Sequence, residues 1–426
     1  MFMATAVDLG RELIRRRISL AYGGGNIGLQ GAVASTVFTN GGLVRGFIPG
    51  YIATRRVYGP TYGVEHTVSC NYYKYFEMNH AVEAFIVLPG GVDTMEGLFS
   101  LISWASEGLH NRPIGLLNID GYFNNLIKFL DDAVRQNFVS LSQRKLFISS
   151  FFVDELLDKL EFAKAFPGPG VLIIDKHNLF KSRSKCYNDK HEDLKCHSLK
   201  YSRSHSLGRN PKFMATAVDL GRELIRRRIS LAYGGGNVGL QGAVASIVFT
   251  NGGLVRGFIP GYIATRRVYG PTYGVEHTVS CNYYKYFEMN HAVEAFIVLP
   301  GGVDTMEGLF SLISWASEGL HNIPIGLMNI DGNFNNLIKF LDDAVRQNFV
   351  YLSQRKLFIS SFFVDELLEK LEFAKAFPGP GSFPSLFGMV LEVGLAKGLL
   401  THRWDVLPIA GWVVSQKPMV FALTTA

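Results

Sequence analysis

Residues 84–97 read AFIVLPGGVDTMEG, and the same fourteen residues recur unchanged as 295–308. Ala84 to Leu88 is an apolar run with the length of a buried strand, and Pro89-Gly90-Gly91 is a turn. The residues from Thr94 to Glu107 then have helical spacing. A strand that feeds a helix through a glycine turn is the unit from which parallel sheets are built.

The same alternation of strands and helices continues on both sides of this segment through the first copy. We predict helices at Thr5–Arg17, Gly28–Phe38, Asn71–Val82, Thr94–Glu107, Phe123–Gln136 and Val153–Phe162. We predict strands at Ile18–Tyr22, Leu43–Ile48, Ala84–Leu88, Pro113–Leu117 and Lys145–Ile148. This order predicts an α/β fold with a parallel sheet covered on both faces, and ligands bind such sheets at the carboxyl ends of the strands.

The chain contains a long tandem repeat. Residues 2–170 recur as residues 213–381, and seven of the 169 aligned positions differ: Ile27/Val238, Thr36/Ile247, Arg112/Ile323, Leu117/Met328, Tyr122/Asn333, Ser140/Tyr351 and Asp158/Glu369. Each unit is long enough to bury its own core, so this is a domain duplication and not a solenoid. We predict domains at 1–170 and 205–381, a linker at 171–204 and a tail at 382–426.

The net charge of +6 comes from one segment. Between Asp175 and Lys212 there are ten basic and four acidic residues, so this segment carries the whole excess and the rest is formally neutral. The segment predicts a flexible basic linker, and no nucleic-acid-binding surface is expected. The tail has apolar patches at 386–400 and 406–414 and no motif, so it either docks on the second copy or is poorly ordered.

Composition excludes several classes of protein. With 48% hydrophobic and 18% charged residues, the 426-residue chain is neither disordered nor fibrous. It has no uninterrupted apolar run long enough for a membrane span and no secretory signal, and four cysteines do not make a disulfide scaffold. These features predict a cytoplasmic protein, with the nucleus as a second location.

Two glycine turns could hold a phosphate. Gly23-Gly24-Gly25-Asn26 follows the strand ending at Tyr22, and Pro89-Gly90-Gly91 follows the strand ending at Leu88. Glycine permits close approach of the backbone, and the following helix offers free N–H groups to an anion. Neither turn is a Walker A loop or a GxGxxG fingerprint, and the alternative is a plain strand–helix turn.

Four segments carry a family resemblance: YGGGNIGLQG (22–31), Lys74-x-x-Glu77-Met78, AFIVLPGGVDTMEG (84–97) and PIGLLNIDGYFNNLIKFLDDAV (113–134). Together they resemble the LONELY GUY family of cytokinin riboside 5′-monophosphate phosphoribohydrolases, over nearly all of each repeat. The resemblance implies a Rossmann-like, doubly wound sheet in two tandem copies. It also implies hydrolysis of an N-glycosidic bond through an oxocarbenium-like state, without a cofactor, in a homodimer or a pseudo-dimer within one chain.

The chain departs from the family pattern PGGxGTxxE and from its preceding Arg-Lys pair. The Arg falls on Lys74 and the Lys on Tyr75, while Asp93 replaces the third Gly of PGGxGT and the closing Glu falls on Gly97. Lysine keeps the charge of arginine but not its forked geometry. Glu96 stands one place before the motif position, about 100° away around a helix. The second copy repeats these departures.

The resemblance implies two sets of site residues. Catalytic roles fall to Lys74, Glu96, Lys285 and Glu307. Substrate contacts fall to Arg56, Tyr75, Gly90, Gly91, Val92, Asp93, Thr94, Met95, Gly97 and Ser103, and to Arg267, Tyr286, Gly301, Gly302, Val303, Asp304, Thr305, Met306, Gly308 and Ser314. The ligand is expected to be a nucleoside 5′-monophosphate. The alternative is an impaired homologue that binds nucleotide or dimerises without turnover.

The resemblance also implies that each copy lacks a first strand, because the family begins with an apolar strand that ends in a phosphate loop. Residues 195–203, ahead of the second copy, are too polar for a central strand, although 204–210 resembles the end of that loop. The missing strand is expected to leave an unpaired edge inside the sheet.

Other candidates are weaker. Cys186, His191, Cys196 and His197 match no standard zinc spacing. Cys70 and Cys281 are expected to be small buried side chains, His80 a surface or packed histidine, and Arg15-Arg16-Arg17 a solvated helix end. The aromatic residues Tyr72, Tyr73, Tyr75 and Phe76 could stack on a base or could belong to a core and dimer interface.

Overall fold

The computed structural model describes residues 1–53, 58–165, 207–264, 269–376 and 420–424. These residues divide into two compact units. The first unit holds the first copy together with residues 301–310 and 333–355, and the second holds the described residues of 205–300, 311–332 and 356–426. The predicted connector and most of the predicted tail lie outside the described residues, so the domain boundaries stay predictions.

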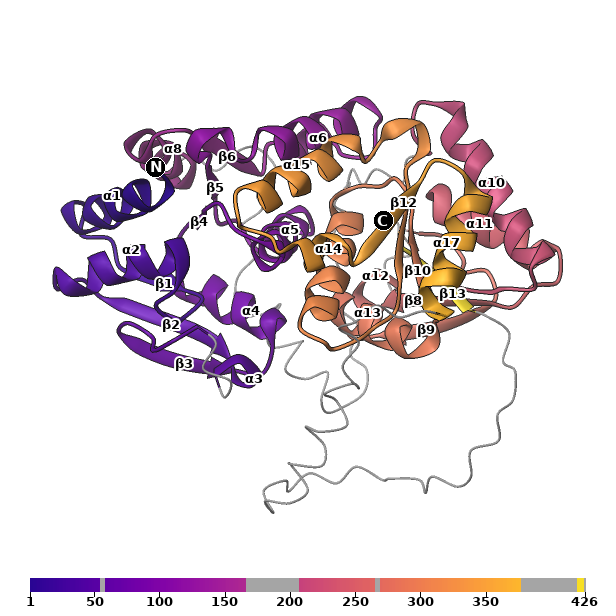
Figure 1. Ribbon diagram of the computed structural model, residues 1–426, viewed down its shortest axis with the longest axis horizontal. Helices are drawn as coiled ribbons and strands as arrows, with labels where there is room; N and C mark the ends of the chain where they lie inside the picture. The colour runs from indigo at the N-terminus through magenta and orange to yellow at the C-terminus, as the bar shows by residue number, and fades with distance from the viewer. Residues whose placement is uncertain (54–57, 166–206, 265–268, 377–419, 425–426) are drawn as a thin grey trace, which may run out of the picture. The chain divides into compact units, whose positions relative to one another are not determined.

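The first copy alternates helices and strands as its sequence predicts (Figure 1). Its helices are α1 (Phe2–Arg15), α2 (Gly28–Thr39), α3 (Gly50–Ala53), α4 (Asn71–Ala81), α5 (Val92–Ser106), α6 (Asn124–Arg135), α7 (Leu141–Arg144) and α8 (Val153–Ala165), with a 3-10 turn η1 (Ile119–Gly121). Its strands are β1 (Leu20–Tyr22), β2 (Val44–Pro49), β3 (Val64–Val68), β4 (Phe85–Val87), β5 (Ile114–Leu117) and β6 (Phe147–Ser150).

The second copy repeats these elements. Its helices are α10 (Pro211–Arg226), α11 (Gly239–Thr250), α12 (Gly261–Ala264), α13 (Asn282–Ala292), α14 (Val303–Ser317), α15 (Asn335–Arg346), α16 (Leu352–Arg355) and α17 (Val364–Ala376), with η3 (Ile330–Gly332). Its strands are β7 (Ser230–Tyr233), β8 (Val255–Pro260), β9 (Val275–Val279), β10 (Ala295–Val298), β11 (Ile325–Met328) and β12 (Phe358–Ser361). A further strand, β13 (Val420–Thr424), comes from the tail.

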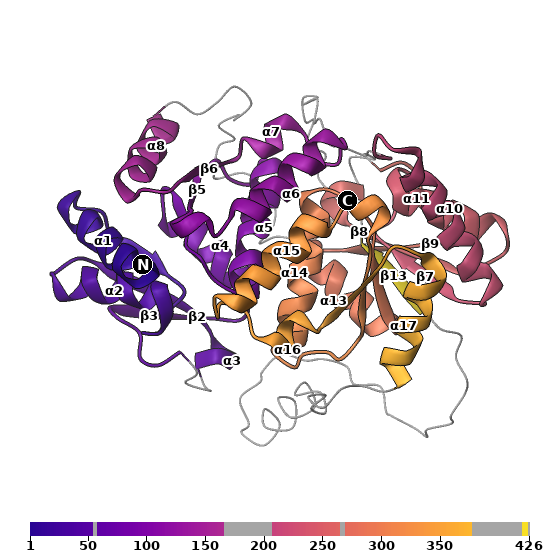
Figure 2. The ribbon, with the colours of Figure 1, turned by 45° about the horizontal axis from the view of Figure 1, so that its top comes forward.

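Every strand pair in the described part of the chain is parallel, which confirms the predicted fold class. The second copy has one seven-stranded sheet in the order β12-β11-β10-β13-β7-β8-β9. Helices cover both of its faces, with α10, α11 and α17 on one side and α13 on the other (Figures 1 and 2). The first copy has two three-stranded sheets, β1-β2-β3 and β4-β5-β6.

The two sheets of the first copy share one core. Tyr22 and Leu29 from the amino-terminal half pack in the same buried cluster as Leu117 and Leu156 from the carboxyl-terminal half. The sequence did not predict β3, because its residues Val64 to Val68 alternate weakly and four of the five are exposed. An edge strand of this kind gives little hydrophobic periodicity.

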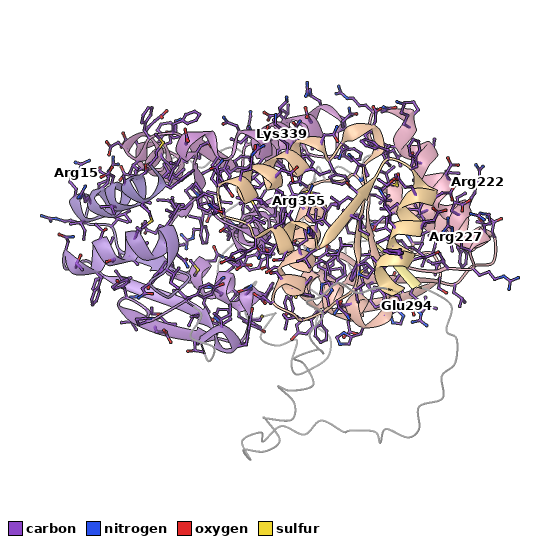
Figure 3. All side chains as sticks on the ribbon, in the orientation of Figure 1. Arg15, Arg222, Arg227, Glu294, Lys339 and Arg355 are labelled. Carbon is purple, nitrogen blue, oxygen red and sulfur yellow. The ribbon has the colours of Figure 1, made fainter. Side chains whose placement is uncertain are left out.

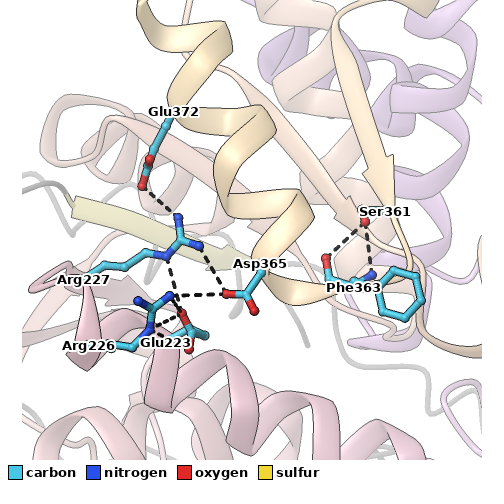
Figure 4. A network of polar contacts seen from close by, with 7 residues as sticks. All are labelled: Glu223, Arg226, Arg227, Ser361, Phe363, Asp365 and Glu372. Atoms are coloured by element: carbon cyan, nitrogen blue, oxygen red, sulfur yellow. Dashed lines mark hydrogen bonds and ion pairs between the residues drawn. The ribbon is translucent and has the colours of Figure 1, made fainter.

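Ion pairs tie α10 to α17 in the second unit (Figure 4). The guanidinium of Arg227 donates to Glu372 and Asp365, both at 3.2 Å, and to Glu223 at 3.4 Å. Hydrogen bonds from Arg226, and also from Arg227, lower the pKa of Glu223 to about 2. In the first copy Arg16 pairs with Glu12 on α1 and with Asp154, Asp158 and Glu161 on α8.

Exposed basic side chains lie on separate helices. Arg15 is on α1, Arg222 on α10 and Lys339 on α15 (Figure 3). Arg15 and Arg222 each pair with an acidic residue three positions earlier, Glu12 and Asp219. These pairs fit the neutral charge balance predicted for the folded part. No helix among the described residues is long and apolar enough to cross a membrane, and the cellular location stays a prediction.

Candidate functional site

The turn between β4 and α5 is tight enough to require glycine. A Cβ on Gly90 would lie 2.1 Å from the Thr94 Oγ1, and one on Gly91 would lie 2.6 Å from the main-chain oxygen of Phe349, which belongs to the same unit. Gly91 is the N-cap of α5, and no side chain caps the helix there. The start of α5 therefore presents main-chain N–H groups and the positive end of the helix dipole.

A buried carboxylate lies within the first two turns of α5. Glu96 is 4% exposed, and the Nδ2 of Asn71 donates to its Oε2 at 3.2 Å. Asn71 is the first residue of α4, the helix that also carries Lys74. This hydrogen bond joins α4 to α5, and Glu307 is also buried in the second copy. Sequence reasoning missed Asn71, whose only signal was its position at a helix start.

The lysine of the predicted site interacts with the tyrosine that follows it. The Nζ of Lys74 lies 4.6 Å from the ring centroid of Tyr75, and the Nζ of Lys285 lies 4.5 Å from that of Tyr286. This is cation–π geometry. In the second copy both side chains are buried, at 9% and 3% exposed. Both copies therefore hold a cation at the position where the family has arginine.

Tyr75 also fills the space beside Gly97. Its hydroxyl donates to the main-chain oxygen of Asp93 at 3.1 Å. A Cβ on Gly97 would lie 2.5 Å from that hydroxyl oxygen. The two departures from the family motif, at positions 75 and 97, are thus spatially coupled: the tyrosine occupies the space into which a side chain at 97 would extend.

Tyr58 links the two glycine turns, and sequence reasoning missed it. Its main-chain oxygen accepts from the N–H of Asn26 at 2.8 Å, and its hydroxyl donates to the Asp93 Oδ2 at 3.3 Å. The N–H of Gly25 donates to the Thr61 Oγ1 at 3.1 Å. Two N–H groups of the first turn therefore already have protein acceptors. This favours a structural role for that turn, while the second turn remains the phosphate candidate.

Other predicted contact residues divide by burial. The side chains of Val92, Met95, Val303 and Met306 are at most 2% exposed, so they belong to the core, and only their main chain could reach a ligand. A Cβ on Gly301 would lie 2.1 Å from the Thr305 Oγ1, the same distance as from a Cβ on Gly90 to the Thr94 Oγ1. Arg56 and Arg267 lie outside the described residues.

Ser103 contacts the start of α14, a helix of the second copy, within the first unit. Its hydroxyl donates to the Asp304 Oδ1 at 3.1 Å. Nearby, the rings of Phe99 and Phe310 stack with centroids 5.4 Å apart and an interplanar angle of 6°. Ser314 is fully buried like Ser103. The predicted site residue Ser103 thus sits against the second copy's predicted site residue Asp304.

Helices α6 and α15 exchange matching hydrogen bonds in that unit. The Nδ2 of Asn125 donates to the Asp343 Oδ2 at 2.6 Å, and the Nδ2 of Asn336 donates to the Asp132 Oδ2 at 2.6 Å. Asn336 and Asp343 are the repeats of Asn125 and Asp132, 211 positions later. Such reciprocity is the pattern of a two-fold interface, in which one surface meets its own copy.

The remaining candidates are structural or outside the described residues. Tyr72 packs edge-on against Trp104, with 5.1 Å between ring centroids, as a core residue would. The Nδ1 of His80 lies 2.8 Å from the Phe76 main-chain oxygen within α4. The zinc candidates from Cys186 to His197 lie outside the described residues, and the described residues contain no other cluster that could hold a metal.

Comparison with known proteins gives two tandem matches. A family model described as possible lysine decarboxylase matches residues 30–160 and 241–371. A probable cytokinin riboside 5′-monophosphate phosphoribohydrolase of Oryza sativa subsp. japonica is 46% identical over 156 residues, 37% of this chain and 74% of the relative. A cytokinin riboside 5′-monophosphate phosphoribohydrolase of Arabidopsis thaliana is 45% identical over 159 residues, 37% of this chain and 70% of the relative.

The chain belongs to the LONELY GUY family. The two matched segments fall one in each copy, so this LONELY GUY chain carries its family's domain twice. The match begins within α2 and ends within α8 in the first copy, and it therefore includes both α4 and α5.

Proposed function

We propose that the chain hydrolyses the N-glycosidic bond of cytokinin riboside 5′-monophosphates, releasing the free base and ribose 5-phosphate. The relatives carry this activity in their names. The observation that carries the proposal is the buried carboxylate of Glu96, hydrogen-bonded to Asn71, in the helix that starts at the Gly90-Gly91 turn. A carboxylate beside a phosphate-binding helix start is what the cleavage of a nucleotide's glycosidic bond requires.

Each residue has a separate role in this proposal. The N–H groups at the start of α5 and the cation of Lys74 hold the 5′-phosphate. The carboxylate of Glu96 stabilises positive charge on the ribose ring as the bond to the base breaks, and it accepts a proton from the attacking water. In the second copy, Lys285 and Glu307 have the same roles.

The test is incubation of the full chain with an N6-substituted adenosine 5′-monophosphate and measurement of the released base. Changing Glu96→Gln and Glu307→Gln together is expected to lower the rate by about 10²- to 10⁴-fold. The matched control is Asp8→Asn with Asp219→Asn, since these carboxylates are exposed on α1 and α10. Equal rates in the two double variants would remove Glu96 and Glu307 from the reaction.

A second function is nucleotide binding without turnover. The observation that favours it is the position of Tyr75, whose hydroxyl occupies the space beside Gly97 where the family motif has its closing Glu. In this case calorimetry would detect adenosine monophosphate binding, and no base would be released. Restoring the motif with Lys74→Arg, Tyr75→Lys and Gly97→Glu, together with their second-copy equivalents, would then create activity.

The reciprocal bonds between α6 and α15 support pairing of the two copies within one chain. The hydrogen bond from Ser103 to Asp304, at the start of α14, adds a further contact to this pairing. Light scattering coupled to size-exclusion chromatography is expected to give the mass of one chain, 47.3 kDa. A mass of two chains would instead support pairing between chains.

A further inference from the structure

The two copies differ at the centre of their sheets. In the second copy, β13 runs parallel to both β7 and β10 and joins them into one sheet. In the first copy the corresponding strands, β1 and β4, are end strands of two separate sheets. Among the described residues, nothing pairs with the edge of β1 opposite β2 or with the edge of β4 opposite β5.

These edges are chemically the same in both copies. Residues 19–22 and 230–233 both read SLAY, and residues 84–88 and 295–299 both read AFIVL. The strand that fits between β7 and β10 therefore meets the same main-chain groups and the same side chains between β1 and β4. The described residues supply one such strand, β13, for two equivalent positions.

Side-chain exposure reflects this difference. In the second copy Leu231, Ala232, Ile297 and Leu299 are all 0% exposed. Their counterparts in the first copy, Leu20, Ala21, Ile86 and Leu88, are each partly exposed. Unpaired strand edges with apolar residues are templates for pairing with another segment, because pairing satisfies main-chain groups and removes apolar surface from water.

We propose that β1 and β4 of the first copy form a binding site for an extended apolar peptide segment with the chemistry of Val420–Thr424. The segment adds as a central strand parallel to both edges, in the mode of β-augmentation. Its sequence in this chain, VFALT, is uncharged and rich in residues that favour strands. In the second copy Phe421 pairs with Leu231 and Ala295, so the equivalent residue of the bound segment pairs with Leu20 and Ala84.

The test uses the full chain and a synthetic peptide of residues 417–426 with a photoreactive phenylalanine analogue in place of Phe421. Trypsin releases the β1 and β7 regions as residues 18–45 and 229–256, which differ in mass because Ile27 and Thr36 are replaced by Val238 and Ile247. Saturable binding of one peptide per chain with cross-links in 18–45 is the expected result. Cross-links confined to 229–256 would overturn the proposal. The absence of saturable binding would also overturn it, because it would mean that these edges do not accept the peptide or are already covered by another part of the chain.

Two control peptides distinguish strand addition from non-specific hydrophobic binding. A peptide with Ala422→Pro lacks one ladder N–H and is expected to bind at least about tenfold more weakly. A scrambled peptide of the same composition that bound as well as the native one would contradict the proposal. A chain ending at residue 418 lacks β13 and is expected to bind two peptides, one in each copy. If this shortened chain does not fold, the cross-linking result with the wild-type chain still tests the proposed site.

Discussion

The hydroxyl of Tyr75 lies where a side chain at position 97 would begin, with 2.5 Å between the hydroxyl oxygen and a Cβ built on Gly97. That hydroxyl is also fixed by its bond to the Asp93 main-chain oxygen. Glycine at 97 is therefore required by tyrosine at 75, and the closing Glu of the family motif cannot be restored at 97 while Tyr75 keeps this position.

Gly97→Ala is expected to destabilise the protein by about 1–3 kcal/mol through overpacking, although alanine favours helices. In a Tyr75→Ala background the same change is expected to be neutral or stabilising by up to about 1 kcal/mol. Urea denaturation of the wild type, the two single variants and the double variant measures the coupling. Strictly additive effects would show that the two side-chain positions do not share space.

Tyr122→Phe tests the support of the glycine turn. The buried hydroxyl of Tyr122 donates to the Gly90 main-chain oxygen at 2.7 Å, and burial raises the pKa of Tyr122, so it stays a neutral donor. Removing this hydrogen bond is expected to lower the free energy of unfolding by about 1 kcal/mol. Tyr351→Phe is the control, since Tyr351 is 77% exposed. A similar cost for both variants would argue against the Tyr122 bond as the cause.

Arg227→Met is expected to destabilise the second copy by about 2 kcal/mol, because the guanidinium bonds to carboxylates of both α10 and α17 and is mostly buried. Arg226→Met, next to it and 62% exposed, is expected to cost less than about 0.5 kcal/mol. Thermal unfolding of the two variants provides the comparison. The prediction fails if Arg226→Met costs as much as Arg227→Met.

Acid is expected to weaken the fold through two partly buried histidines, His110 and His321. Burial lowers the pKa of both His110 and His321 to about 4. As pH falls from about 6.5, the usual histidine value, toward about 4, the unfolded chain binds protons that the folded chain does not, so the free energy of unfolding falls. Each histidine contributes up to about 1.4 kcal/mol per pH unit in that window.

Urea denaturation at several pH values between 5 and 7 measures this slope. The variant His110→Gln with His321→Gln is expected to be less stable at pH 7 and to show a smaller slope. The carboxylates Glu12 and Glu223, whose pKa values in the folded chain are about 2, lose their stabilising contribution mainly below pH 5. Both proteins keep these carboxylates, so their contribution cancels in the comparison. An unchanged slope in the double variant would assign the pH dependence to other groups.

The sequence by itself determined the duplication, the parallel α/β fold and the family. Each of these rests on local patterns: an apolar strand, a glycine turn and a helix with buried spacing, written twice. Such patterns reflect main-chain conformation and burial, which neighbouring residues specify. The same local signal was too weak for the exposed strand β3.

Only the tertiary structure decided which side chains meet. The contacts of Tyr75 with Gly97, of Asn71 with Glu96 and of Tyr58 with both glycine turns join different elements, and no spacing in the sequence encodes them. The pairing of β13 between β7 and β10 joins segments more than 120 residues apart. Strand partners are chosen by main-chain hydrogen bonding and burial in the assembled sheet, so a short apolar segment of the tail acquires its place only there.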